Sequence, residues 1–114
     1  MSKYRQHQIL VRELCISIQK EYPLALIFQP SVGLFFTKSG RPIKIGKNGQ
    51  SDIYLLHPHS AMKLLFYVAI EVKTGNSQLS PVQKNFKREV ESRGGTYILA
   101  RSVEQTLEEL KNVI

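Results

Sequence analysis

The sequence predicts an α/β protein in which helices flank a mixed β-sheet. Near both ends of the 114-residue chain, apolar residues recur every three to four positions, which is typical of amphipathic helices. Between these regions, short apolar runs rich in β-branched and aromatic residues alternate with Gly, Pro and Ser clusters, as in strands joined by turns. Strands that are followed by helices favour a sheet with helices packed against it.

The N-terminal half predicts one helix and up to four strands. Residues 3–21 form a helix whose apolar stripe ends at Pro23, because proline cannot continue a helix. Short strands are predicted at 25–28, 34–36, 42–45 and 51–56. The segment His57–Ser60 is expected to end the last of these strands.

The C-terminal half predicts a strand, a helix, a strand and a helix. Residues 64–72 form the longest apolar run and are expected to be a buried central strand. Ser80, Pro81 and Gln83 form a helix start with a capping box, and Gly94-Gly95 ends that helix. A strand at 96–100 precedes a last helix from Val103. The expected core order is α-β-β-β-α-β-α.

Composition indicates one soluble domain, residues 1–114, without repeats or linkers. No apolar run approaches the length of a membrane helix, and the N-terminus lacks a secretory apolar region. The single Cys15 fits a reducing compartment such as the cytoplasm. Gly46–Gly49 lacks the Gly-Lys-Ser/Thr phosphate loop, so no nucleotide cofactor is expected. A net charge of +7 favours nucleic acid as the partner, although a merely basic surface would give the same charge.

Three charged residues interrupt the apolar strands. Asp52 opens one strand, and Glu71 and Lys73 stand at the end of another. Side chains alternate along a strand, so Glu71 and Lys73 face the same side, and Asp52 reaches Glu71 if the two strands pair. Two adjacent carboxylates repel each other and favour a cation such as Mg²⁺. The backbone carbonyl of Val72 could add an oxygen ligand.

Lys73 would then lie beside the cation, where it could orient an attacking water or stabilise charge on a phosphate. The chemistry implied is hydrolysis of a phosphodiester. The alternative interpretation is an exposed Glu-Lys pair at a strand edge, which contributes little.

The wider pattern resembles a known nuclease superfamily. Gly-x-x-Asp before a strand and Ile-Glu-Val-Lys at the end of another resemble the PD-(D/E)xK nucleases. The following Leu79-Ser80-Pro81-Val82-Gln83, the Gly94-Gly95 pair and Arg101-Ser-Val-Glu104 are similar to the stand-alone VRR-NUC proteins of bacteria and phages. The resemblance runs from about residue 28 to residue 110 and implies a restriction-endonuclease-like core.

The resemblance implies a role for each matching residue. Asp52 and Glu71 match the metal-binding acids, Val72 gives its carbonyl to the metal, and Lys73 matches the catalytic lysine. Gln83 matches the glutamine of the following helix, although its capping role would compete with a role at the metal. The implied cofactor is Mg²⁺ or Mn²⁺. The implied protein is a homodimeric endonuclease acting on branched DNA such as a four-way (Holliday) junction.

The chain also departs from the family pattern. Ser51 replaces the proline that usually precedes the motif aspartate, and Tyr4 stands where an acid is expected in the first helix. Glu13 is the only acid within residues 1–20, and its place off the apolar stripe favours a solvated side chain over one that lines the site.

Five basic residues are expected to contact DNA phosphates: Lys44, Lys47, Lys84, Lys87 and Arg88. Two rival functions remain open from the sequence. One is a nucleic-acid-binding module without cleavage. The other is a restriction-type nuclease that reads a short sequence.

Overall fold

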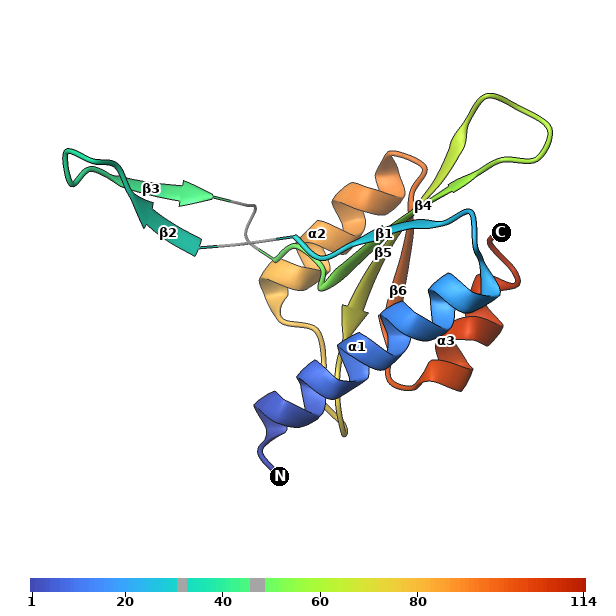
Figure 1. Ribbon diagram of the computed structural model, residues 1–114, viewed down its shortest axis with the longest axis horizontal. Coiled ribbons are helices and arrows are strands. Elements are labelled where there is room, and N and C mark those ends of the chain that lie inside the picture. Colours follow the sequence, from blue (N-terminus) through green and yellow to red (C-terminus); the bar gives the residue numbers. More distant parts are fainter. Residues whose placement is uncertain (31–32, 46–48) are drawn as a thin grey trace.

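A four-stranded sheet with helices on both faces forms the body of the protein, and a two-stranded hairpin projects from it (Figure 1). The computed structural model describes residues 1–30, 33–45 and 49–114. The helices are α1 (Lys3–Glu21), α2 (Pro81–Ser92) and α3 (Val103–Leu110). The strands are β1 (Leu26–Phe28), β2 (Gly33–Phe36), β3 (Pro42–Ile45), β4 (Ile53–Pro58), β5 (Leu65–Val72) and β6 (Thr96–Ala100).

The sheet is mixed, as predicted, with the strand order β1-β4-β5-β6. Strand β4 pairs antiparallel with β1 and β5, whereas β6 runs parallel to β5. A parallel pair needs a crossover connection, which α2 supplies. The expected core order α-β-β-β-α-β-α is confirmed for α1, β1, β4, β5, α2, β6 and α3, with β2 and β3 inserted after β1.

Each helix begins at a serine that caps it. The side chains of Ser2, Ser80 and Ser102 accept hydrogen bonds from backbone amides three residues further on. These bonds satisfy amide groups that have no partner inside the helix. Among the residues that the structure describes, no helix combines the length and the apolar character needed to cross a membrane.

The main core lies between the sheet and the pair α1 and α3. Val11, Leu14 and Ile18 form the buried stripe of α1 and pack on β4 and β5 through residues such as Leu55 and Ile70. Helix α2 covers the other face, where a smaller cluster contains Tyr54, Ala69, Phe86, Val90 and Tyr97. The cluster of buried residues is therefore larger on the α1 and α3 side, and α2 leaves part of its own face of the sheet uncovered.

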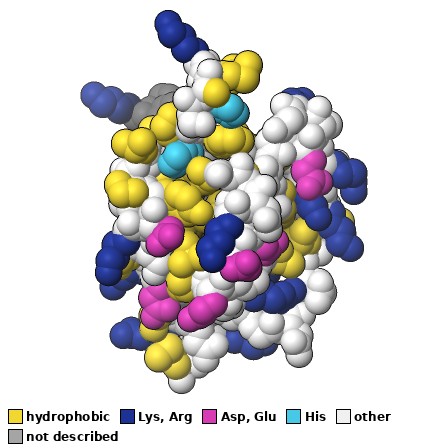
Figure 2. Space-filling model, turned by 90° about the vertical axis from the view of Figure 1, so that its right-hand side faces the viewer, with side chains coloured by type: hydrophobic (Ala, Val, Ile, Leu, Met, Phe, Trp, Pro, Cys, Tyr) yellow, Lys and Arg dark blue, Asp and Glu magenta, His cyan; other side chains and the backbone are white. Residues whose placement is uncertain are grey.

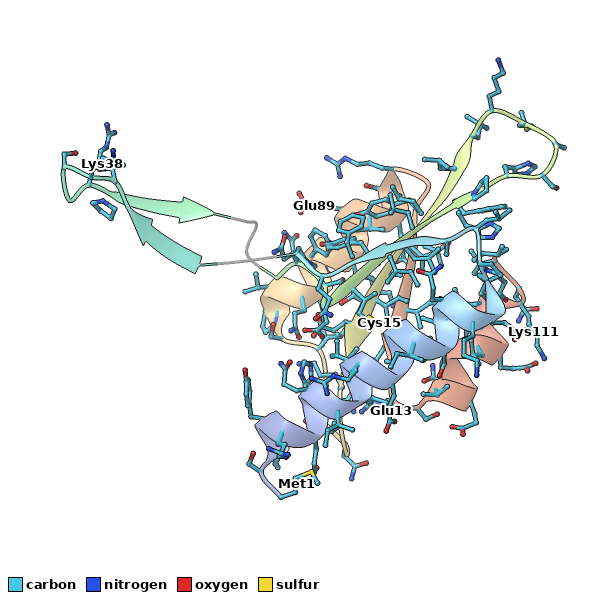
Figure 3. All side chains as sticks on the ribbon, in the orientation of Figure 1. Met1, Glu13, Cys15, Lys38, Glu89 and Lys111 are labelled. Atoms are coloured by element: carbon cyan, nitrogen blue, oxygen red, sulfur yellow. The ribbon has the colours of Figure 1, made fainter. Side chains whose placement is uncertain are left out.

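Strands β2 and β3 form a separate antiparallel hairpin. Figure 3 shows Lys38 at the tip of this hairpin, far from the helices. A tight turn at the tip is closed by hydrogen bonds between Thr37 and Arg41. Gly40 in this turn has a φ of 86°, a conformation that glycine adopts without strain.

Two strand predictions are partly wrong. Strand β4 runs over Ile53–Pro58 instead of the predicted 51–56, because its ladder with β5 begins at Ile53 and still forms pairs opposite Phe66 and Leu65. Strand β5 is central, but only its C-terminal half is buried, and Leu65 is 60% exposed. The N-terminal half of β5 extends past the helices, so apolar content there does not imply burial.

Candidate active site

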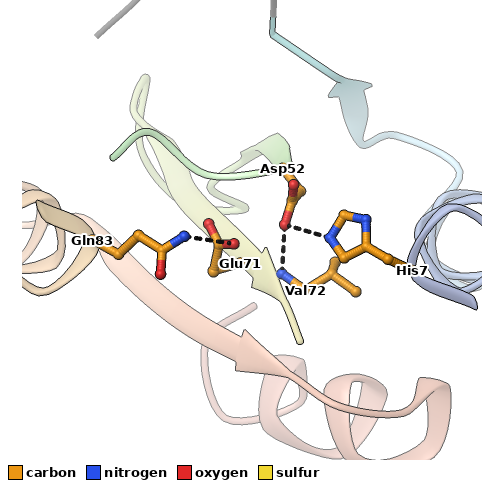
Figure 4. Close-up of polar contacts among 5 residues, drawn as sticks. All are labelled: His7, Asp52, Glu71, Val72 and Gln83. Carbon is orange, nitrogen blue, oxygen red and sulfur yellow. Dashed lines mark hydrogen bonds and ion pairs between the residues drawn. The ribbon is translucent and has the colours of Figure 1, made fainter. Parts of the chain in front are cut away.

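Asp52 lies immediately before β4, at the end of the sheet where β5 terminates. Ile53 pairs with Ile70, so continuing the antiparallel register places Asp52 opposite Glu71. The Asp52 Oδ2 atom accepts a hydrogen bond of 2.8 Å from the backbone amide of Val72 (Figure 4). This hydrogen bond joins Asp52 to the last residue of β5, as the predicted pairing of the two strands requires.

Glu71 is a buried acid with an unsatisfied oxygen. Glu71 is only 4% exposed, and its Oε1 atom has no hydrogen-bond partner within the described part of the chain. Burial raises the pKa of Glu71 to about 8, and the charge of Asp52 and a hydrogen bond with it add to the rise. The charge of Lys73 acts in the opposite direction. A metal-free Glu71 thus holds its proton near neutral pH.

This pair of acids fits a divalent cation. A buried carboxylate with a free oxygen beside a second carboxylate is costly until a positive charge is added. Within the described residues, no three His, Cys, Asp or Glu side chains are grouped closely enough to hold a metal. The side-chain ligands would therefore be the two acids, a set that suits Mg²⁺ or Mn²⁺ completed by water and backbone oxygen. The Val72 side chain is fully buried in the core, so only its backbone could contribute.

Gln83 contacts both its own helix cap and Glu71, although capping was expected to compete with a role at the site. Its Oε1 atom accepts a hydrogen bond of 2.9 Å from the Ser80 amide, which completes the capping box. Its Nε2 atom donates a 3.2 Å hydrogen bond to Glu71 Oε2. Because an amide has an acceptor at one end and donors at the other, the two contacts coexist. The cap holds the side chain of Gln83 against Glu71.

Lys73 directly follows β5 and is half-buried. Its backbone amide donates a 3.0 Å hydrogen bond to the carbonyl of Ala100 at the end of β6. The loop after Lys73 is held by Arg101, whose guanidinium donates to the carbonyls of Gly75 and Ser77 at 2.9 and 2.7 Å. These contacts anchor the lysine backbone beside the acids, and its positive charge acts on Glu71.

His7 of α1 contacts Asp52, and it is not among the site residues predicted from the sequence. Its Nε2 atom lies 3.3 Å from Asp52 Oδ2, and both side chains are about one-quarter exposed, at 27% and 26%. Both residues line a cavity of about 250 Å³ together with Gln8, Gln29 and Gln50. The available signal was the helical stripe: His7 precedes the buried Val11 by four positions, so the two lie on the same face of α1.

Two buried hydroxyl groups lie near the acids. Ser51 Oγ and the Tyr97 hydroxyl are both buried. Burial raises the pKa of Tyr97, the charges of Glu71 and Asp52 raise it further, and a hydrogen bond with the Ser51 side chain acts to lower it. The neighbouring Tyr54 hydroxyl accepts a 3.2 Å hydrogen bond from the Ser51 amide. The Ser51 side chain, which replaces the usual proline, therefore adds a polar atom close to the acids.

Comparison with models of protein families identifies the family of this chain. The model of the VRR-NUC domain matches residues 12–104. The chain belongs to the VRR-NUC family. VRR-NUC is a PD-(D/E)xK-type nuclease domain, which supports a nuclease function with DNA as the implied substrate. Neither the curated proteins nor the solved structures contain a match.

The basic residues of this VRR-NUC domain are only partly placed by the structure. Lys84, Lys87 and Arg88 lie on α2, the helix that begins beside Glu71, and Lys84 and Arg88 are exposed. Lys44 lies in β3, where the structure describes the backbone alone, and Lys47 lies outside the described residues. Figure 2 shows a face with basic, acidic and hydrophobic side chains side by side, so that face is not uniformly basic.

The first helix of the VRR-NUC domain brings no acid to Asp52. Tyr4, which stands at the expected acid position, is 75% exposed. Glu13 is exposed on α1, as expected for a solvated side chain. Among the described residues, His7 is the side chain of α1 with a hydrogen bond to an acid of the site.

Proposed function

We propose that this protein is a Mg²⁺- or Mn²⁺-dependent endonuclease that hydrolyses DNA phosphodiester bonds. The observation that carries the proposal is the meeting of Asp52, Glu71 and Lys73 at one end of the sheet of a VRR-NUC domain, where Glu71 Oε1 has no hydrogen-bond partner among the described residues. The proposed domain comprises residues 1–114. We further propose that it acts in a reducing cytoplasm, which its single Cys15 permits.

Asp52, Glu71 and the Val72 carbonyl would hold the cation, which supplies Lewis acidity and lowers the pKa of water. Lys73 would orient the attacking water or stabilise negative charge that develops on the phosphate. Gln83 holds Glu71 through its amide, so the carboxylate keeps its direction. Mutation of a residue that orients a metal ligand in this way typically costs about 10–100-fold in metal affinity or activity.

Lys84, Lys87 and Arg88 are proposed to contact DNA phosphates, with Lys44 and Lys47 as further candidates. Helix α2 carries Lys84, Lys87 and Arg88 and begins at the acid pair, so a DNA strand whose phosphates follow α2 would pass the cation. The exposed Lys38 and Arg41 at the tip of the β2–β3 hairpin could extend the contact to a second part of a branched substrate.

We propose a homodimer acting on four-way junctions or other branched DNA. Support for an interface comes from a ring cluster in which Tyr54 stacks on Phe28 and contacts Tyr67, because Phe28 and Tyr67 remain 44% and 38% exposed. A cavity of about 540 Å³ adjoins this cluster at the C-terminal end of α2. Apolar surface of this kind favours association. Two copies would place two active sites on two strands.

The main rival is a nucleic-acid-binding module without cleavage. Wild-type protein is incubated with supercoiled, linear, flap and four-way-junction DNA in Mg²⁺, Mn²⁺ or EDTA. The proposal predicts metal-dependent cutting with a preference for branched DNA. Binding without cutting in every metal contradicts the proposed enzyme. Discrete fragments from linear DNA would instead support a restriction-type nuclease.

A further inference from the structure

We propose that His7 is a positioning residue that fixes the orientation of Asp52 for the cation. This inference rests on the proposed metal centre and concerns the contribution of α1, which otherwise lacks an acid at the site. The observation that starts it is the 3.3 Å contact between His7 Nε2 and Asp52 Oδ2 (Figure 4).

The helix places His7 at the acid pair because of its packing. Val11, Leu14 and Ile18 bury one face of α1 against the sheet. Moving four residues from Val11 toward the N-terminus keeps the same face and gives His7. His7 lies beyond the apolar part of the sheet, next to the end where Asp52 precedes β4. The polar side chain of His7 therefore continues the buried stripe at the point where the sheet becomes polar.

The hydrogen bonds on Asp52 define which oxygen remains for a metal. Oδ2 accepts a hydrogen bond from the Val72 amide and is also in contact with His7 Nε2. When Nε2 of His7 carries a proton, Oδ2 accepts from two donors, one on β5 and one on α1, and these restrict rotation of the carboxylate about its bond to the chain. The other oxygen, Oδ1, is then the one offered to a cation held jointly with Glu71.

The view in Figure 4 favours a positioning role over direct ligation. His7 and Glu71 lie on opposite sides of Asp52 in that view. The three side chains are not grouped closely enough to share a metal within the described part of the chain. An imidazole that donates from Nε2 to a carboxylate also cannot bind a metal through that nitrogen. His7 therefore acts on the cation through Asp52.

The test measures Mn²⁺ binding to the folded protein without DNA, by calorimetry and by electron paramagnetic resonance. We expect His7→Ala to weaken Mn²⁺ binding about 10–100-fold, the usual cost of removing a group that orients a ligand. His7→Gln places an amide donor at a similar distance and is expected to restore most of the affinity. Tyr4→Ala, on the same helix and 75% exposed, serves as the control and should bind like the wild type.

Pulsed resonance on the wild-type Mn²⁺ complex should show no nitrogen bound directly to the metal. Direct nitrogen coordination would overturn the positioning role, and so would His7→Gln binding as weakly as His7→Ala. Equal affinities of His7→Ala and wild type would overturn the inference while leaving the metal centre intact. A wild-type protein that binds no Mn²⁺ would overturn both this inference and the proposed centre, so the two failures are distinguishable.

Discussion

Gln83 is predicted to matter for catalysis and for stability by separable routes. Replacing it by Ala removes two hydrogen bonds, the 2.9 Å contact with the Ser80 amide and the 3.2 Å contact with Glu71. At a net contribution of about 0.5–1.5 kcal/mol for each bond, the free energy of unfolding should fall by about 1–3 kcal/mol. Glu71 would then have no hydrogen bond from Gln83, so its carboxylate would lose its fixed direction.

Ser80→Ala is the matched control. It removes the serine oxygen that accepts from the Gln83 amide, at a cost of about 0.5–2 kcal/mol, but leaves the contact between Gln83 and Glu71 possible. Thermal unfolding should therefore show similar losses for the two variants. Single-turnover cleavage, measured well below both melting temperatures, should fall about 10–100-fold for Gln83→Ala and stay near the wild-type rate for Ser80→Ala. Equal cleavage rates in the two variants would refute the reasoning.

Two further predictions concern charge. The pKa of Glu71 is about 8 in the folded protein, against an ordinary 4.5. The unfolded chain therefore loses this proton at a lower pH than the folded protein does. As a result, the free energy of unfolding of the metal-free protein should fall as pH rises from about 4.5 to about 8. Glu71→Gln should flatten that dependence in thermal unfolding, and an unchanged slope would contradict the assigned pKa. Lys84→Gln and Arg88→Gln should each reduce the slope of log affinity for duplex DNA against log salt by about 0.9, measured by fluorescence anisotropy, if each side chain contacts one phosphate. Lys111→Gln, in an exposed pair with Glu108, is the control, and a loss of slope there as well would argue against a specific face.

Local patterns predicted most of the fold. The helix starts at Ser80 and Ser102 follow from capping side chains and apolar spacing, which depend on neighbours within one or two turns. The limits of β4 and the exposure of Leu65 were missed, because they depend on how far a partner strand and the covering helices extend. The hydrophobicity of a segment does not indicate how long its partner strand is or where the covering helices end.

The candidate site was also predictable only in part, because some of its contacts follow from local patterns and others depend on tertiary packing. Alternation along β5 and pairing with β4 bring Glu71 and Asp52 together, and both features can be read from sequence. His7 was missed because its contact joins residues 45 positions apart and depends on where α1 crosses the sheet. The dual role of Gln83 was missed because a capping motif describes one end of the amide and not the other.

The most direct test of the central claim is single-turnover cleavage of a four-way junction in Mg²⁺ by Lys73→Ala, with junction binding measured in parallel. The proposed mechanism predicts that binding persists while the cleavage rate falls by about 10²–10³-fold, the cost of removing one group that stabilises the transition state. Lys111→Ala, a change in an exposed lysine that is paired with Glu108, should cleave like the wild type. Cleavage by Lys73→Ala at the wild-type rate would contradict the assignment of the active site to the end of β5.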